Sequence, residues 1–176
     1  VGENNAWRGG DGDVWERGPY WLDGALPMAY ILEDEELKKE VMAFVEWTLD
    51  SQQENGFFGP TPKEDIEKEP GLQKGNRADW WPRMVMLKVL QSYYTATQDE
   101  RVLDFMTDYF KYQQKMLPEQ PLNHWTHWSK SRGGENQLSI YWLYNRTGDE
   151  FLLDLAQTVY EQTRDWTDIF LRDEFG

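Results

Sequence analysis

The chain has 176 residues, of which 39% are hydrophobic, so it is long and apolar enough to form one domain with a buried core. Its 32 acidic and 18 basic residues give a net charge of −14, which argues against nucleic-acid partners because these require a basic face. It has no cysteine, which excludes disulfides, thiolate zinc sites and a cysteine nucleophile. No apolar run approaches the ~20 residues of a membrane span.

Hydrophobic residues recurring at helical spacing predict six helices. They are expected at residues 19–31, 35–52, 80–97, 100–116, 135–146 and 150–170. Pro19 suits a first helical turn, and Asp34 is a plausible N-cap. Four aromatic residues at helical spacing are predicted to lie in the core: Phe44, Phe105, Phe110 and Tyr160.

The helices are organised as a repeat of hairpins. Residues 11–30, 75–90 and 130–144 each contain a loop with arginine and a carboxylate, followed by an apolar helix. Each of these helices is followed by a second one that starts at an Asp-Glu pair. Such repeats indicate the architecture before any single residue does.

Turns within the hairpins are short, whereas the connections near 53–78 and 117–134 are long. This alternation predicts an all-α fold, with three of the six hairpins of an (α/α)6 toroid and the long loops around its mouth. Residues 1–176 are expected to form a single, partial toroid domain, and the start at Val1 suggests a piece of a longer protein.

Six tryptophans lie in loops at or before helix starts, where aromatic residues more often bind ligands than fill a core. They are Trp7, Trp15, Trp80, Trp81, Trp125 and Trp128.

Four ordered segments, 20–24 (YWLDG), 50–57 (DSQQENGF), 133–137 (GGENQ) and 144–149 (YNRTGD), resemble glycoside hydrolase family 127, the β-L-arabinofuranosidase-like proteins. The resemblance covers about residues 13–160. It implies an (α/α)6 barrel, usually followed by β-sandwich domains, that removes sugars from plant or host glycans. It also implies a periplasmic or secreted protein whose partners are the remaining hairpins and a β-sandwich domain.

The sequence departs from this family in two places. Family members carry a His-Glu-Leu-Tyr-like segment where this chain has Ala78-Asp79-Trp80-Trp81, and their zinc-bound cysteine nucleophile lies beyond the region covered. Because the chain has no cysteine, neither the nucleophile nor the zinc can be assigned to it, and no cofactor is expected within it.

Glycoside hydrolysis generally requires two carboxyl groups, and we predict Asp79 and Glu135 as this pair because both lie at starts of predicted inner helices. Asp79 is also well suited to be a helix N-cap, since aspartate just before a first turn caps helices. Twelve residues with stacking or hydrogen-bonding side chains in or near the mouth loops are predicted to bind substrate. They are Trp15, Glu16, Arg17, Asp23, Arg77, Trp80, Trp81, His124, Trp125, His127, Arg132 and Asn136.

Several of these residues have a structural alternative. Glu16 and Arg17 are also suited to a local ion pair that orders the loop, and the glycines at 133–134 either approach a ligand or simply turn the chain. His124 and His127 lack a third ligand, so no metal site is predicted.

The sequence thus predicts a glycosidase segment that acts on a neutral carbohydrate, with arabinofuranosides as possible substrates. One alternative is a toroid that binds carbohydrate or acts as a scaffold without catalysis. A weaker alternative is a polysaccharide lyase or unsaturated-uronide hydrolase, which the net negative charge disfavours.

Overall fold

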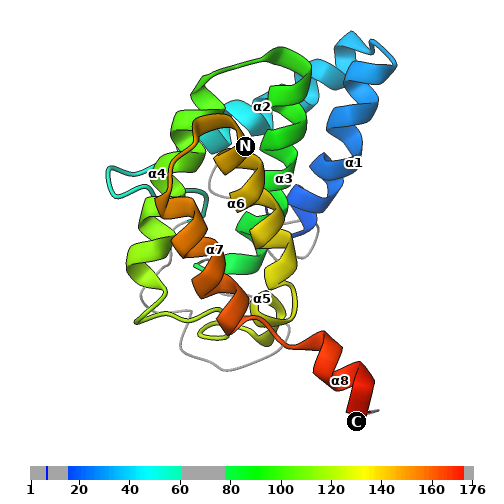
Figure 1. Ribbon diagram of the computed structural model, residues 1–176. Coiled ribbons are helices and arrows are strands. Elements are labelled where there is room, and N and C mark those ends of the chain that lie inside the picture. The colour runs from blue at the N-terminus through cyan, green and yellow to red at the C-terminus, as the bar shows by residue number, and fades with distance from the viewer. Residues whose placement is uncertain (1–6, 8–15, 61–77, 173–176) are drawn as a thin grey trace, which may run out of the picture.

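The computed structural model describes residue 7 and residues 16–60 and 78–172, and these residues form eight helices with no strand among them. The helices are α1 (Arg17–Ile31), α2 (Glu35–Asp50), α3 (Trp80–Thr97), α4 (Arg101–Met116), α5 (His127–Ser131), α6 (Gly133–Thr147), α7 (Phe151–Gln162) and α8 (Trp166–Arg172) (Figure 1).

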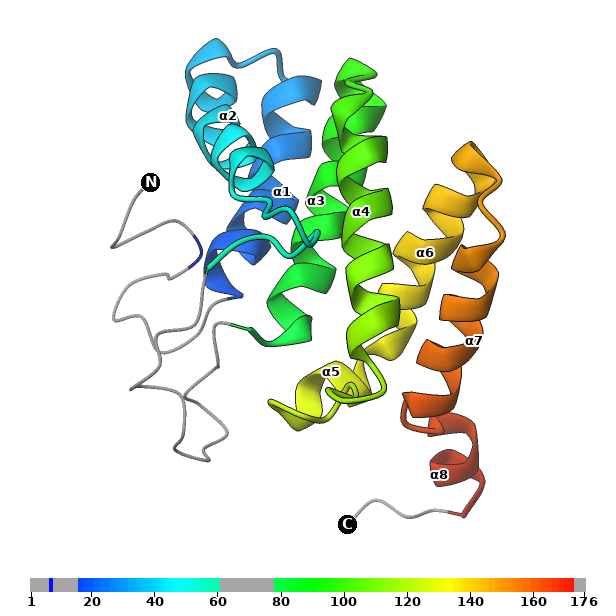
Figure 2. The ribbon, with the colours of Figure 1, turned by 90° about the vertical axis from the view of Figure 1, so that its left-hand side faces the viewer.

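The helices pair into three hairpins, α1–α2, α3–α4 and α6–α7, which stand side by side in two layers (Figure 2). Helices α1, α3 and α6 form one layer, in which α3 contacts both neighbours, and α2, α4 and α7 form the other. This arrangement confirms the predicted all-α class and is that of a partial α/α toroid. We call the α1–α3–α6 layer the inner layer.

Two elements differ from the sequence-based prediction. The expected helix at 150–170 is broken, because Thr163 has an extended backbone (φ −71°, ψ 151°) and its hydroxyl donates a hydrogen bond back to the carbonyl of Val159 at 2.7 Å. The short helix α5 lies within the predicted loop 117–134.

The core predictions hold for three of the four aromatic residues. Phe105 and Phe110 are buried, and Phe44 packs against the core while remaining partly exposed. Tyr160 was predicted wrongly: its side chain is 64% exposed, because it lies on the outward face of the last turn of α7. Trp7 was also misassigned to a binding loop, since it is fully buried with its ring against Trp47 and Phe58.

The start of α3 is fixed by the buried guanidinium of Arg83. Its Nε donates to the carbonyl of Phe58 at 2.9 Å, and its two terminal nitrogens donate to the carbonyls of Asp79 at 2.9 Å and Pro60 at 3.1 Å. The same guanidinium lies 4.1 Å from the centroid of the Phe57 ring. One side chain therefore joins the segment after α2 to the first turn of α3.

Helix caps lie at two of the short turns. Asp34 Oδ1 accepts from the backbone N–H of Glu36 at 3.1 Å and of Leu37 at 3.0 Å, which confirms it as the N-cap of α2. Gly148 ends α6 with φ +73°, a left-handed conformation that glycine adopts without steric cost.

The turn between α3 and α4 carries an ion-pair network. Arg101 contacts Glu46 at 2.8 Å and Asp99 at 2.7 Å, and the hydroxyl of Tyr93 donates to Asp99 at 2.9 Å. The hydrogen bonds from Arg101, opposed by partial burial and reinforced by Tyr93, lower the pKa of Asp99 from its usual 3.8 to about 2.

A depressed carboxyl pKa makes the folded state sensitive to acid. Asp99 contributes its stabilisation fully above its unfolded pKa, and this contribution is lost as the pH falls toward about 2. We expect Asp99→Asn to lower the free energy of unfolding at about pH 6 and to flatten its decline between about pH 4 and pH 2, as measured by urea unfolding. The control is Asp149→Asn, at the equivalent turn of the third hairpin; an equal effect there would contradict the account.

The two glycines at the start of α6 have different surroundings. A Cβ on Gly133 would lie 1.8 Å from Thr163 Oγ1 and 2.9 Å from Thr163 Cβ, whereas a Cβ on Gly134 would meet nothing within 4 Å. The close approach of Gly133 is therefore to the α7–α8 connection of the same chain.

This difference gives a matched pair of variants. Gly133→Ala is expected to destabilise the fold by about 1–3 kcal/mol, the usual cost of overpacking. Gly134→Ala is expected to be neutral or to stabilise the helix by up to about 1 kcal/mol. Thermal and urea unfolding of both variants measure the contrast, and equal stabilities would refute the packing at Gly133.

Candidate functional site

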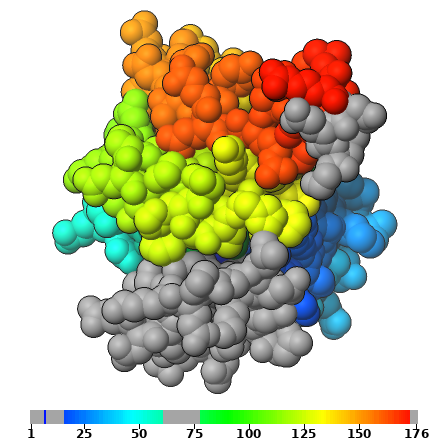
Figure 3. Space-filling model, turned by 90° about the horizontal axis from the view of Figure 1, so that it is seen from below, coloured from blue at the N-terminus to red at the C-terminus, as the bar shows by residue number. Residues whose placement is uncertain are grey.

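The three inner helices begin at the same end of the molecule. Figure 2 shows the first turns of α1, α3 and α6 at the lower end, close to α5. Seen from that end in Figure 3, the segment around α5 lies between α7 and the α1–α2 hairpin. The N-termini of helices carry partial positive charge, so this end suits groups with electron-rich oxygens.

An aromatic and cationic contact joins the three inner helices here. The rings of Tyr20 on α1 and Trp81 on α3 lie 5.8 Å apart, and the guanidinium of Arg132, just before α6, lies 4.6 Å from the Trp81 ring centroid. Trp128 of α5 lies 6.0 Å from the same guanidinium. The contact leaves Tyr20 45% exposed, so it can be reached from solvent.

Four charged side chains surround this contact. Burial raises the pKa of Tyr20, Arg132 opposes the shift, and the carboxylates of Glu16, Glu135 and Asp23 add to it. All three carboxylates therefore lie close enough to the Tyr20 phenol to raise its pKa.

Lys88 Nζ completes the set by pairing with Asp23 Oδ2 at 2.9 Å. The hydrogen bond to Asp23 raises the pKa of Lys88, burial opposes this, and the nearby charge of Glu135 and the Tyr20 phenol raise it further. We call this group the central cluster. It consists of Glu16, Tyr20, Asp23, Trp81, Lys88, Arg132 and Glu135.

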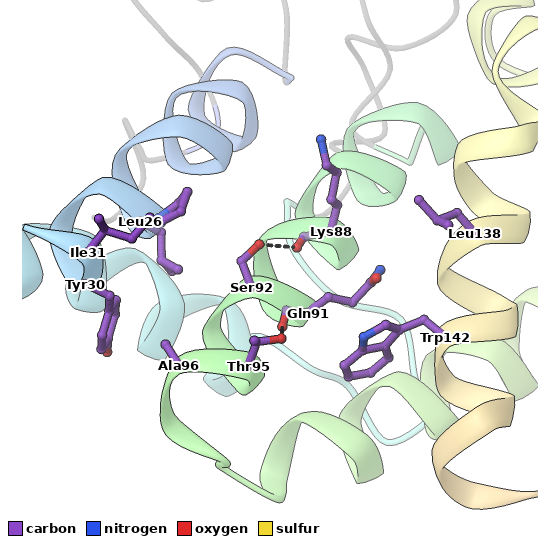
Figure 4. Close-up of a pocket in the computed structure, with 11 residues that line it drawn as sticks. Leu26, Tyr30, Ile31, Lys88, Gln91, Ser92, Thr95, Ala96, Leu138 and Trp142 are labelled. Atoms are coloured by element: carbon purple, nitrogen blue, oxygen red, sulfur yellow. Dashed lines mark hydrogen bonds between the residues drawn. The ribbon is translucent and has the colours of Figure 1, made fainter.

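Further along the inner helices from the cluster, the inner face is hollowed into a cavity of about 450 Å³ between α1, α3 and α6 (Figure 4). Its lining is largely apolar, with Leu26 and Ile31 on α1 and Leu138 and Trp142 on α6. Lys88 stands at the upper edge of this cavity in Figure 4 and so belongs to both the cavity and the central cluster.

Asp79 lies among different neighbours from Glu135. It is 3% exposed, and its carboxylate accepts hydrogen bonds from Ser129 Oγ at 2.6 Å, Thr126 Oγ1 at 2.8 Å and the backbone N–H of Trp81 at 3.3 Å. It is the N-cap of α3, the alternative that the sequence left open, and it ties that helix to α5 and the residue before it.

The two tryptophans that start α3 point to opposite sides. Both are buried, but Trp81 contacts other members of the central cluster, whereas Trp80 packs its ring 6.1 Å from Tyr112 and donates from Nε1 to the carbonyl of Gln120 at 3.1 Å. Asn136 is also fully buried, and its amide donates to Gln113 Oε1 at 2.9 Å. Trp80 and Asn136 are thus held by the protein interior.

The remaining predicted residues lie around the mouth. His124 and His127 each pack 4.3 Å from the ring of the following tryptophan, Trp125 and Trp128. Arg17 is exposed at the first turn of α1. Trp15 and Arg77 lie outside the described residues.

Sequence reasoning missed Tyr20 and Lys88 as site residues. Tyr20 was noted only as part of the YWLDG segment, although it lies one helical turn before Asp23, on the same face of α1. Lys88 is a single cation within an otherwise apolar stretch of α3, a pattern that signals a partner on a neighbouring helix.

The described residues do not fit the zinc site that the family resemblance implies. That site uses cysteine thiolates, which the chain lacks, and no group of three or more His, Asp or Glu side chains suited to a metal occurs in the described part. No step of the chemistry is therefore assigned to a metal held by these residues.

None of the described helices is both long and apolar enough to cross a membrane.

The hairpin array, with carboxylates, cations and aromatic rings gathered where its inner helices begin, defines an α/α-toroid protein with a mouth suited to a polar ligand. The family model for the β-L-arabinofuranosidase, GH127 catalytic domain, matches residues 2–169. The chain therefore belongs to the GH127 catalytic-domain family, a family of glycoside hydrolases. Comparisons with curated proteins and with solved structures give no match.

The geometry of Asp79 predicts a role in stability. Asp79→Asn replaces one carboxylate oxygen with an NH2 group, which cannot accept a hydrogen bond, so we expect a loss of about 1–3 kcal/mol in the free energy of unfolding. Ser129→Ala should lower stability in the same direction, and a double-mutant cycle should show coupling between the two positions. Independent effects would contradict the hydrogen bond between them.

Proposed function

We propose that this domain hydrolyses glycosidic bonds of neutral, arabinofuranoside-type glycans at the central cluster. The family match supports a glycosidase, and the observation that carries the location is the gathering of Tyr20, Trp81 and Glu135 from three inner helices. Tyr20, which is 45% exposed and rests on the buried Trp81, offers aromatic surface for the apolar face of a sugar ring. The carboxylates and Arg132 offer acceptors and donors for its hydroxyl groups.

Glu135 is the carboxylate that we propose for proton transfer. It is exposed in the first turn of α6, and its charge contributes to the raised pKa of both Tyr20 and Lys88. Hydrolysis breaks the glycosidic C–O bond as water adds to the anomeric carbon and the leaving oxygen takes up a proton, and a carboxyl group at this position can supply that proton.

We propose different roles for the other acids. The pairing of Asp23 with Lys88 makes it a residue that orients the cluster and binds sugar hydroxyls. Asp79, predicted as the second catalytic carboxyl, is hydrogen-bonded and buried, and we propose that it positions Trp81 by capping α3.

The charges of the central cluster are nearly balanced, because three carboxylates lie beside the two cations Lys88 and Arg132. This near balance favours a neutral glycan over an acidic one.

The test is Glu135→Gln assayed on 4-nitrophenyl arabinofuranosides of both anomeric configurations. We expect kcat to fall about 10²–10⁴-fold, the usual contribution of a general acid, while sugar binding and thermal stability are retained. The control is Glu40→Gln, which alters an exposed carboxylate on α2.

Full activity of Glu135→Gln would refute the assignment. Sugar binding without turnover in the unaltered protein would instead support the non-catalytic binding toroid. Turnover of unsaturated uronides in place of arabinofuranosides would support the lyase or uronide-hydrolase alternative.

A further inference from the structure

A second cavity, of about 270 Å³, lies at the same end of the molecule but on the other side of α3. Its lining combines three amide side chains and three aromatic rings. These are Gln53, Asn55, Gln120, Phe57, Tyr112 and Trp125. We call it the outer cavity.

The outer cavity is separate from the central cluster, with which it shares no lining residue. The wall between them is the first turn of α3, where Trp81 contacts Tyr20 and Arg132 while Trp80 contacts Tyr112 and Gln120. A ligand in the outer cavity therefore does not occupy the proposed hydrolytic site.

The cavity walls are held in place by the protein. Phe57 packs edge-on against Tyr112 with ring centroids 5.5 Å apart, and Asn55 Oδ1 accepts from the backbone N–H of Phe57 at 2.9 Å. Gly56 has φ +91°, and a Cβ there would lie 2.2 Å from the carbonyl oxygen of Asp108 on α4. The turn at 53–57 is thus pressed against α4, so one wall of the cavity is preformed.

The chemistry of the lining selects for an uncharged ligand with hydroxyl groups. None of the lining side chains is ionised, and a side-chain amide carries both donors and acceptors, which are the groups that pair with vicinal hydroxyls. Trp125, which also lines the cavity, has a buried indole Nε1 that makes no hydrogen bond within the described part of the chain. Aromatic rings beside these groups provide surface for the C–H face of a sugar.

We propose that the outer cavity binds one uncharged sugar residue of a glycan. Its volume lies near the lower end of the range for ligand pockets, which suits a single ring rather than a long oligosaccharide. Binding here anchors a further part of a branched or polymeric substrate beside the mouth. The proposal concerns binding alone and does not depend on hydrolysis at the central cluster.

The experiment is an NMR titration of the ¹⁵N-labelled protein, following the tryptophan indole N–H signals. Arabinotriose and xylotriose are the neutral probes, and a galacturonic acid trimer is the acidic one. The signal of Trp125, assigned by its absence in Trp125→Phe, is expected to shift saturably with at least one neutral probe and not with the acidic probe.

Two variants test the lining directly. Gln120→Ala removes the side-chain amide but keeps the carbonyl that Trp80 uses, and Tyr112→Phe removes only the hydroxyl. We expect Gln120→Ala to raise the Kd about fivefold, equivalent to one hydrogen bond of about 1 kcal/mol, and Tyr112→Phe to raise it by up to the same factor. The matched control is Gln114→Ala, whose amide points to the carbonyl of Phe151 on α7 and should leave the Kd unchanged.

Three results would overturn the proposal. The first is the absence of a saturable shift of the Trp125 signal with either neutral trisaccharide. The second is a Kd unchanged in Gln120→Ala, and the third is equal binding of the acidic probe. Glu135→Gln should not alter this Kd, so failure of the outer cavity is distinguishable from failure of the glycosidase proposal.

Discussion

The buried guanidinium of Arg83 is the constraint on which the mouth of this domain depends. It satisfies carbonyl groups of residues 58, 60 and 79, which lie on either side of a long connection, and stacks on Phe57. A fully buried cation is costly unless its donors are paired, so these carbonyls and the cation require one another. The result is that α3 begins at a fixed place relative to the turn after α2.

From this fixed start, α3 divides the mouth into two environments. Asp79 caps the helix and holds Ser129 and Thr126, which brings α5 and Arg132 toward Trp81. On one side, charged groups gather around Tyr20 and Trp81, where we propose that hydrolysis takes place. On the other side, Trp80 supports an uncharged cavity of amides and rings. One helix start therefore separates the proposed hydrolytic site from the proposed sugar-binding cavity and keeps the charges of the first away from the second.

The sequence predicted the hairpins well because helical periodicity, an Asp34 cap and short Asp-Glu turns are local signals. It predicted the site less completely, because burial and pairing depend on contacts between distant segments. Asp79 shows the limit, since a capping and a catalytic aspartate look alike until Ser129, fifty positions away, is seen to bond it. Lys88 likewise acquires its role only through Asp23, on another helix.

The most direct test of this account is a crystal structure of the protein with L-arabinose bound. We expect ordered sugar against the exposed Tyr20 ring, with its hydroxyls hydrogen-bonded to Glu135 and Arg132. A sugar bound at saturating concentration elsewhere on the molecule, with none at the central cluster, would contradict it.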